Sequence, residues 1–249
     1  MKGYLFLLLA FISAFSSCKN AQTEESTLSA QAIVDSAISK SGGVNYENLK
    51  VAFDFRNKSY QLERENGKFT YQRAFTDSSE NRFVDRLWNA GFERTINDSV
   101  VSLSEKKANA YSNSINSVMY FALLPYGLND SAVEKEVLPT VSIKNINYHK
   151  IKVTFKQEGG GEDFDDVFIY WFRKENFQLD YFAYKYHTDG GGIRFREAYG
   201  RSEFGGVSFA NYVNYKPKSQ EIDFFGIDAL FENGELMEVS RIENEGFRD

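Results

Sequence analysis

The sequence contains one cysteine, two histidines and three prolines among its 249 residues. A single cysteine cannot close a disulfide within the chain. With so few histidines and cysteines, the zinc sites that are usually built from these two residue types are excluded. The scarcity of proline and the aromatic content of 16% favour an antiparallel sheet over a bundle of helices.

Clusters of basic residues and long apolar runs are missing as well. The formal net charge is −6 and no run of lysine and arginine interrupts the chain, so nucleic acid is not an expected partner. The most apolar segment, Tyr4 to Phe15, is broken only by Ser13 and follows Lys2. It is too short to span a hydrocarbon core of ~30 Å and is typical of a secretory signal peptide.

The position of Cys18 directly after two serines gives this segment a second meaning. It resembles a bacterial lipobox, in which the signal is removed and the cysteine receives lipid. We therefore predict a signal peptide over residues 1–17, a lipidated Cys18 with a polar tether over residues 18–28, and a membrane partner reached through the N-terminal lipid. The expected location is the cell envelope, as an outer membrane lipoprotein. The alternative is an ordinary secretory signal with an incidental cysteine.

Residues 29–249 are predicted to form one domain of the α+β class. Ser29 begins a helix with apolar residues at three- and four-residue spacing, which Gly42 and Gly43 end. A second helical region is expected over 106–124, before Pro125. Most of the remaining chain alternates with a period of two, which predicts a single strongly curved antiparallel sheet, a half-barrel of about nine to eleven strands, with the helices covering its concave face.

Three turn signals and one further strand refine this prediction. Asn66-Gly67, Asn97-Asp98 and Asn233-Gly234 each predict a tight turn between two strands. Residues 222–225 are predicted to add a short strand near the C-terminus.

Two of the predicted strands, residues 167–172 and 181–186, carry apolar groups on both faces. A half-buried antiparallel strand is polar on one face, so these two strands indicate either solid packing on both sides or a sheet that curls around an apolar cavity. A lipid or another hydrophobic small molecule is the expected ligand of such a cavity, and plain core packing is the alternative for each residue. The candidate lining residues are Phe53, Phe69, Tyr71, Tyr120, Phe121, Trp171 and Phe182.

Arg194 and Arg196 lie two residues apart on a predicted strand and therefore share one face. Two guanidinium groups on one face are suited to clamp the carboxylate or phosphate of a head group. Asp180 and Tyr184, on a shared face of the preceding strand, would complete this polar patch. The alternative is a cross-strand Arg–Asp pair on an exposed surface.

Acidic residues gather in two glycine-rich turns. Asp163, Asp165 and Asp166 follow three glycines, and Asp189 precedes three more. Calcium takes six to eight oxygen ligands, so these carboxylates form a candidate calcium site if the two turns meet at one end of the sheet. The spacing does not match an EF-hand, and two solvated turns are the alternative. No other cofactor is expected.

Three segments carry a resemblance to known proteins, namely NSVMYFALLPYGLND (116–130), GGGEDFDD (159–166) and GGIRFREAY (191–199). They resemble an uncharacterised family of Bacteroidota lipoproteins, a domain-of-unknown-function group, and the likeness runs over roughly residues 30 to 245. More remotely, the order of the elements is similar to the LolA/LolB lipoprotein carriers. That resemblance implies a curved half-barrel with helical cover that holds acyl chains, although a fold alone does not confer a function.

These observations favour a lipid-anchored envelope protein that binds a lipid or another amphiphile in an apolar cavity. One alternative is an envelope hydrolase that uses Asp163, Asp165 or Asp166 together with Arg194 and Arg196. Another is a surface or scaffold protein without a small ligand. Convergent carboxylates and arginines in a cleft would favour the enzyme, and a filled interior would favour the scaffold.

Overall fold

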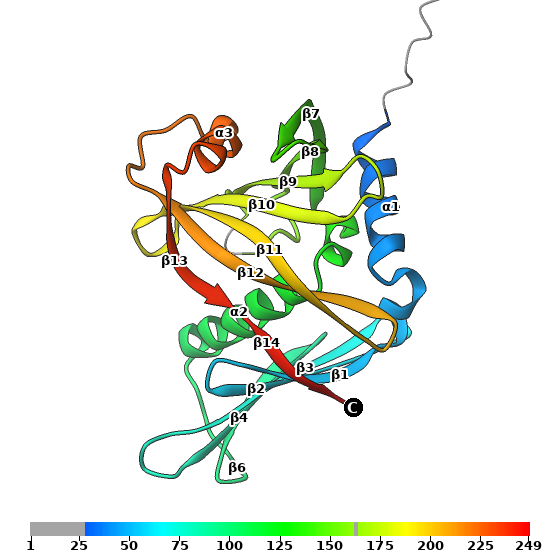
Figure 1. Cartoon of the computed structure of the whole chain (residues 1–249). Helices are drawn as coiled ribbons and strands as arrows, with labels where there is room; N and C mark the ends of the chain where they lie inside the picture. The colour runs from blue at the N-terminus through cyan, green and yellow to red at the C-terminus, as the bar shows by residue number, and fades with distance from the viewer. Residues whose placement is uncertain (1–27, 162–163) are drawn as a thin grey trace, which may run out of the picture.

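The computed structural model describes residues 28–161 and 164–249 (Figure 1). The predicted signal peptide, Cys18 and all of the tether except Leu28 lie outside the described residues, as does Asp163.

The first helix, α1 (Ala30–Ser41), follows the prediction closely. The Ser29 hydroxyl accepts a hydrogen bond from the Ala32 N–H at 3.1 Å, which satisfies one of the free donors of the first turn. At the other end the Gly42 N–H donates to the Ile38 carbonyl, and Gly43 has a φ of +55°, a conformation that glycine adopts without strain. On the apolar face of α1, Ile33, Val34 and Ala37 are buried, and Ala30 and Ile38 are partly buried.

Two seven-stranded antiparallel sheets form the body of the molecule (Figure 1). Sheet A has the order β14 (Asn244–Arg248), β1 (Lys50–Phe55), β2 (Lys58–Glu65), β3 (Lys68–Thr76), β4 (Arg82–Trp88), β5 (Gly91–Ile96) and β6 (Ser99–Val100). Sheet B has the order β13 (Leu236–Ile242), β12 (Val207–Pro217), β11 (Gly192–Phe204), β10 (Leu179–Tyr186), β9 (Val167–Arg173), β8 (Ile146–Phe155) and β7 (Val133–Ile143). The antiparallel prediction is confirmed, but the prediction of one curved sheet with nine to eleven strands is wrong.

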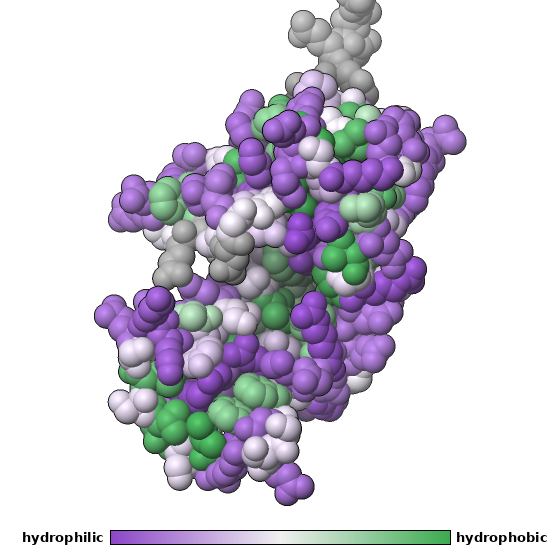
Figure 2. Space-filling model, turned by 90° about the vertical axis from the view of Figure 1, so that its left-hand side faces the viewer, coloured by the Kyte–Doolittle hydropathy of each residue, from purple (hydrophilic) through white to green (hydrophobic). Residues whose placement is uncertain are grey.

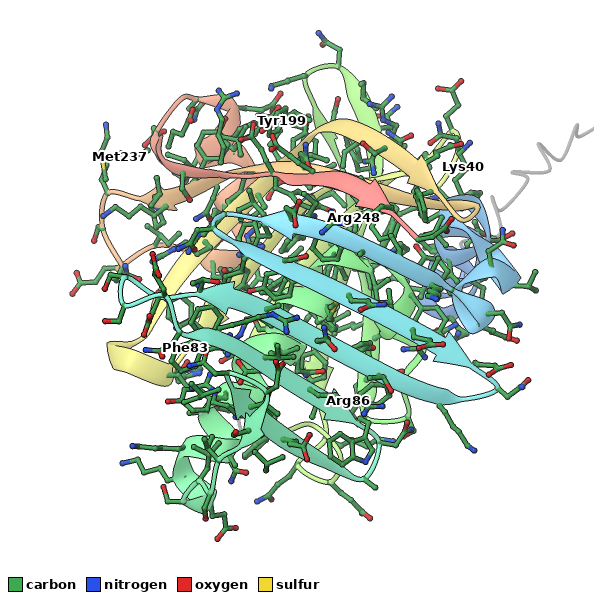
Figure 3. The ribbon with its side chains drawn as sticks, turned by 90° about the horizontal axis from the view of Figure 1, so that it is seen from below. Lys40, Phe83, Arg86, Tyr199, Met237 and Arg248 are labelled. Atoms are coloured by element: carbon green, nitrogen blue, oxygen red, sulfur yellow. The ribbon has the colours of Figure 1, made fainter. Side chains whose placement is uncertain are left out.

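The C-terminal segment explains why there are two sheets. Ile242 at the end of β13 pairs with Tyr212 of β12, whereas Asn244 at the start of β14 pairs with Phe55 of β1. The chain thus changes its partner within two residues, and the Asn211 side-chain oxygen accepts the Asn244 N–H at 2.9 Å at this point. Arg248 then pairs with Asp54 at 2.9 Å, and Figure 3 shows Arg248 beside the strands of sheet A.

The predicted turns have different outcomes. Asn66-Gly67 and Asn97-Asp98 all have positive φ angles and close the β2–β3 and β5–β6 hairpins, as predicted. Asn233-Gly234 instead ends a helix, α3 (Ile227–Glu232), where the Asn233 N–H donates to the Ala229 carbonyl.

The strand predicted over residues 222–225 is also wrong. Phe224–Gly226 form a 3-10 turn, because the Asp223 carboxylate caps the Phe225 N–H at 3.0 Å.

The second long helix, α2 (Glu105–Ala122), lies between the two sheets (Figure 1). Its buried residues Ile115 and Met119 pack in the core of sheet A, while Phe121 stacks on Phe182 of sheet B at 5.5 Å. No helix in the described part of the chain is long and apolar enough to cross a membrane.

Both faces of sheet B are covered, which accounts for its doubly apolar strands. The face with Phe168 and Phe172, called the inner face below, packs with α1 and the end of α2. The opposite face, with Ile169 and Trp171, packs with α3. The buried Lys150 amino group of β8 forms an ion pair with Asp228 of α3 at 2.7 Å, which links the sheet to the helix. The prediction that helices cover a single concave face therefore describes only part of the arrangement.

Candidate ligand pocket

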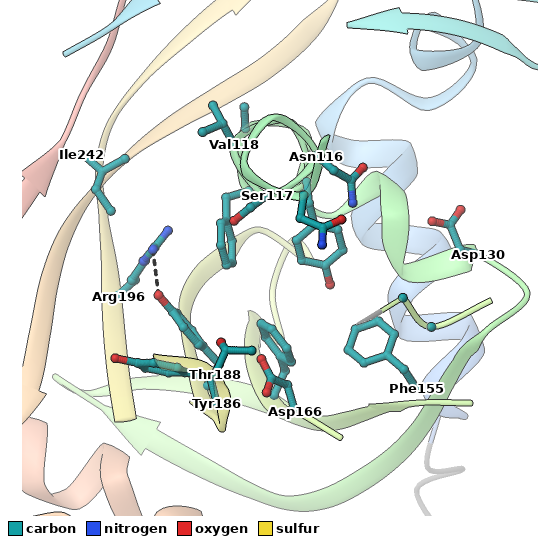
Figure 4. Close-up of a pocket in the computed structure, with 18 of the residues that line it drawn as sticks. Asn116, Ser117, Val118, Asp130, Phe155, Asp166, Tyr186, Thr188, Arg196 and Ile242 are labelled. Carbon is teal, nitrogen blue, oxygen red and sulfur yellow. Dashed lines mark hydrogen bonds between the residues drawn. The ribbon is translucent and has the colours of Figure 1, made fainter. Parts of the chain in front are cut away.

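A pocket of about 540 Å³ lies between α2 and the inner face of sheet B (Figure 4). Tyr120 and Phe121 reach it from α2, Phe168 from β9 and Tyr184 from β10. Since Figure 4 shows Phe155 and Arg196 on opposite sides of the space, the pocket runs across several strands of the sheet.

The lining of the pocket combines aromatic side chains with polar and charged ones. Asn116 and Ser117 are exposed on α2 and line the pocket, whereas Phe121 and Phe168 line its interior. Figure 2 shows that the molecule is hollowed at mid-height on this side. Apolar walls with a few polar groups are the usual composition of a small-molecule site.

Two tyrosines of the pocket, Tyr120 and Tyr212, and Tyr170 behind Tyr120 are neutral hydroxyls. The hydroxyls of Tyr120 and Tyr170 lie 2.9 Å apart, and burial raises the pKa of both well above the ordinary value for tyrosine. Burial also raises the pKa of Tyr212 to about 12. These side chains therefore add no charge to the apolar walls at any physiological pH.

Arg196 is the buried cation of the pocket. Only 8% of its surface is exposed, and its guanidinium lies 4.2 Å from the centre of the Phe121 ring. One Nη donates to the Tyr184 hydroxyl at 2.9 Å, the bond that is dashed in Figure 4. Its Nε–H is buried and has no hydrogen-bond partner among the described residues.

Arg194 shares the face of Arg196, as predicted, since the two lie opposite Tyr184 and Phe182 in the register of β10. Its side chain, however, turns towards the Tyr186 ring at 5.3 Å and donates to the Ile193 carbonyl at 2.9 Å. It does not line the pocket. The predicted two-arginine clamp is therefore wrong, and one arginine of the pair reaches the pocket.

Asp180 and Trp171 also lie elsewhere. A bulge between Leu179 and Tyr181 shifts the register of β10, so Asp180 accepts a hydrogen bond from Tyr148 at 3.0 Å and pairs with Arg173 instead of facing Arg196. Trp171 is fully buried on the opposite face of sheet B, against Phe195 at 5.5 Å. Neither residue lines the pocket.

Of the other aromatic candidates, three pack in the core around sheet A and one lies behind the pocket wall. The former are Phe53, Phe69 and Tyr71, and the latter is Phe182. Sequence reasoning missed Phe155, Phe168 and Asn214, which do line the pocket. Phe168 belongs to the strand with two apolar faces and so left a signal in the sequence, whereas Asn214 lies in a strand that also contains Ser208 and Asn211 and left none.

The two acidic turns meet at one end of sheet B. The His187 imidazole lies 3.5 Å from Asp165 and 3.6 Å from Asp166, and the three side chains place their ligand atoms within 4.8 Å of one another. Asp163 lies outside the described residues. Two carboxylates and an imidazole supply fewer oxygens than the six to eight that calcium takes, so the described residues do not complete a calcium site.

The chain belongs to a family of unknown function, DUF6503, whose model matches residues 2–244. This confirms the membership of an uncharacterised family that the three sequence segments predicted. No curated protein shows a significant match.

Two solved structures show what the chain resembles in space. A LolA superfamily protein from Nitrosomonas europaea is 13% identical, with a TM-score of 0.49 over 90% of this chain and 95% of that one. The lipoprotein LppX from Mycobacterium tuberculosis is 14% identical, with a TM-score of 0.29 over 65% and 89%. With identities this low, these structures do not establish what this chain binds.

Proposed function

We propose that this chain is a lipid-anchored protein of the cell envelope that binds a lipid or another amphiphile in the pocket beneath α2. The observation that carries the proposal is the pocket itself, a space of about 540 Å³ lined by aromatic and polar side chains, with the buried Arg196 among them. Its volume lies within the range of about 300–1,000 Å³ that is typical of small-molecule sites. An interior filled by its own side chains would have supported the scaffold alternative instead.

The hydrolase alternative has less support. Asp166 lines the pocket, but its carboxylate accepts a hydrogen bond from the backbone N–H of His187 at 3.3 Å. Arg194, which the alternative also requires, is outside the pocket. The carboxylates and the two arginines therefore do not converge as a hydrolytic site would require.

Lipid extraction followed by mass spectrometry of the purified protein tests the ligand. We expect an amphiphile to co-purify with the protein and to be lost in Ser117→Trp, which places a large side chain at the opening of the pocket. Asn109→Trp is the matched control, because Asn109 is exposed on the same helix and does not line the pocket. An empty wild-type protein that also fails to take up any added amphiphile would refute the proposal.

The anchor is tested separately. Cys18→Ser should move the protein from the membrane fraction to the soluble fraction, because a cysteine that receives several acyl chains is the only attachment proposed. Unchanged fractionation together with an unchanged mass of the mature protein would contradict a lipidated Cys18.

A further inference from the structure

Arg196 differs from the other buried basic side chains of the described residues in having no carboxylate partner. Arg73 and Arg94 both pair with Asp85, at 2.6 and 2.5 Å, and Lys150 pairs with Asp228. No carboxylate in the described ranges lies within ion-pair distance of Arg196. Arginine keeps its proton at all physiological pH values, so the charge cannot be removed by titration.

Part of the cost of burying this charge is offset by aromatic rings. The guanidinium lies 4.2 Å from the ring centre of Phe121 and 5.3 Å from those of Phe182 and Tyr184. Ring faces attract a cation, but they do not accept the in-plane hydrogen bond that Nε–H donates. The chain thus leaves one strong, charged donor inside the pocket without an acceptor.

A second unsatisfied polar group lies next to Arg196. Asn214 is the cross-strand neighbour of Arg196 on β12 and lines the same pocket. One end of its carboxamide bonds to the Ser240 hydroxyl at 3.2 Å, and the other end is buried without a partner in the described structure. Turning the carboxamide over exchanges its oxygen and nitrogen but still leaves one end free. Two neighbouring strands therefore present two unpartnered polar groups to one space.

The volume of the pocket limits the size of the ligand. At roughly 30 Å³ for each water-sized group, about 540 Å³ holds about eighteen methylene groups. That is the volume of one long acyl chain. The two or three chains of a phospholipid or a lipoprotein anchor exceed it.

Four charged side chains of the described residues line the pocket, the buried Arg196 and Asp166 and the exposed Arg56 and Asp130, and the buried cation is the one that an anionic group inside the pocket would contact. Arg196 lies at one side, whereas Asp130 lies near Phe155 at the other (Figure 4). An anionic group is attracted to the first side and repelled from the second. Because Arg196 is 8% exposed, a head group bound to it is itself buried and the chain extends along Phe121 and Phe168.

From these observations we infer that the ligand is a single-chain anionic amphiphile that binds with its head group inward. An oxygen of its carboxylate or phosphate accepts the Arg196 Nε–H, and Asn214 contacts the same head group. This inference rests on the proposed function, because it names the class of amphiphile that the pocket takes.

Binding of defined amphiphiles to the delipidated protein tests the inference. The probes are palmitate, a monoacyl phosphate, hexadecanol and a diacyl phosphatidic acid, each added below its aggregation concentration and followed by calorimetry. We expect palmitate or the monoacyl phosphate to bind about tenfold or more tightly than hexadecanol, since a hydrogen bond to a charged group has about this effect. The comparison of palmitate with the monoacyl phosphate identifies which head group is preferred. The diacyl lipid should bind weakly.

Two variants connect the preference to Arg196. Arg196→Gln should remove the advantage of the anionic probe and leave hexadecanol unchanged, while Arg194→Gln, outside the pocket, should have no effect. If Arg196→Gln does not fold, Asn214→Asp places a carboxylate beside the guanidinium and should abolish anion binding alone. Equal affinities for palmitate and hexadecanol, equal binding of the diacyl lipid, or an unaltered preference in these variants would each overturn the inference. Those results leave the proposed function standing, whereas a failure of every probe to bind refutes both.

Discussion

Sheet A and sheet B each bury arginine beneath α2, but they balance its charge in different ways. In sheet A, Arg73 and Arg94 share the fully buried Asp85, and Arg73 also donates to the Ser114 hydroxyl of α2 at 2.8 Å. In sheet B, Arg196 has one hydroxyl, three rings and an unpartnered Nε–H. The buried arginines of sheet A thus have a carboxylate partner and that of sheet B has none, while the half-buried Arg64 of β2 donates to the hydroxyls of Tyr71 and Tyr126 and also leaves its Nε–H without a partner among the described residues.

The difference separates a role in stability from a role in binding. A buried ion pair that the chain completes by itself contributes to folding, and its loss appears as instability. A buried cation that the chain leaves partly unsatisfied lowers the stability of the empty protein, and a ligand that completes it raises that stability. The contrast can be tested by removing the carboxylate partner of the two arginines in sheet A and by introducing a carboxylate next to Arg196 in sheet B.

The largest effect is expected from Asp85→Ala. It leaves two buried guanidinium groups without a carboxylate, and breaking a buried pair in this way costs about 3–5 kcal/mol. Urea unfolding measures the change. Asp54→Ala is the control, because its pair with Arg248 is about half exposed and such pairs contribute about 0–1 kcal/mol. Equal losses in the two variants would show that the buried cluster of sheet A is not a stabilising element.

The opposite change is Asn214→Asp, which introduces a carboxylate at the cross-strand neighbour of Arg196. We expect the free energy of unfolding of the empty protein to rise by about 1–2 kcal/mol, since a hydrogen bond to a charged group is gained. Asn211→Asp introduces the same charge on β12 and keeps an acceptor for the Asn244 N–H, so it is the matched control. A gain in the control but not in Asn214→Asp would contradict the comparison.

A smaller effect is expected from removing the hydroxyl partner of each arginine. Tyr184→Phe deletes the hydrogen bond of Arg196 and should lower the unfolding free energy by about 1 kcal/mol. Ser114→Ala removes a partner of Arg73, which keeps Asp85, and should cost less. Thermal unfolding of the two empty variants gives the order, and a larger loss in Ser114→Ala would be contrary to it.

The smallest effect is expected from His149. Unlike arginine, a partly buried histidine without an anionic partner can lose its proton. Burial and, secondarily, Lys174 lower the pKa of His149, which stacks on Phe177 at 5.7 Å. Between the ordinary histidine pKa of about 6.5 and the lower folded value, the unfolded chain binds more protons, so stability should decrease as the pH falls through this window. The decrease should be absent in His149→Gln. A pH profile that is identical in the two proteins would exclude this contribution.

The sequence predicted the features that depend on neighbouring residues. Ser29 and Gly42 define α1 because a cap requires only the residues of its own helix end. Arg194 and Arg196 share a face because strand alternation is local. The dipeptide Asn-Gly, however, closes a hairpin at residue 66 and ends a helix at residue 233. The dipeptide favours positive φ angles but does not choose between these two uses.

Features that depend on distant partners could not be predicted. The bulge between Leu179 and Tyr181, in the pairing with β9, turns Asp180 away from Arg196. Both arginines lie on the inner face, but Arg194 is held by the Tyr186 ring outside the pocket. The change of sheet between Ile242 and Asn244 depends on β1 and β12, which lie far apart in the sequence.

That change of sheet also affects the order of folding. Asp54 of β1 pairs with Arg248, which lies 194 residues later in the chain. Contacts over such sequence separations form slowly. Ile242 and Asn244 also line the pocket, so its wall is complete only when β13 and β14 have paired with β12 and β1. Until then, β1 is an open strand edge that can pair with another chain. The pairing of residues 242–248 therefore closes both sheet A and the pocket.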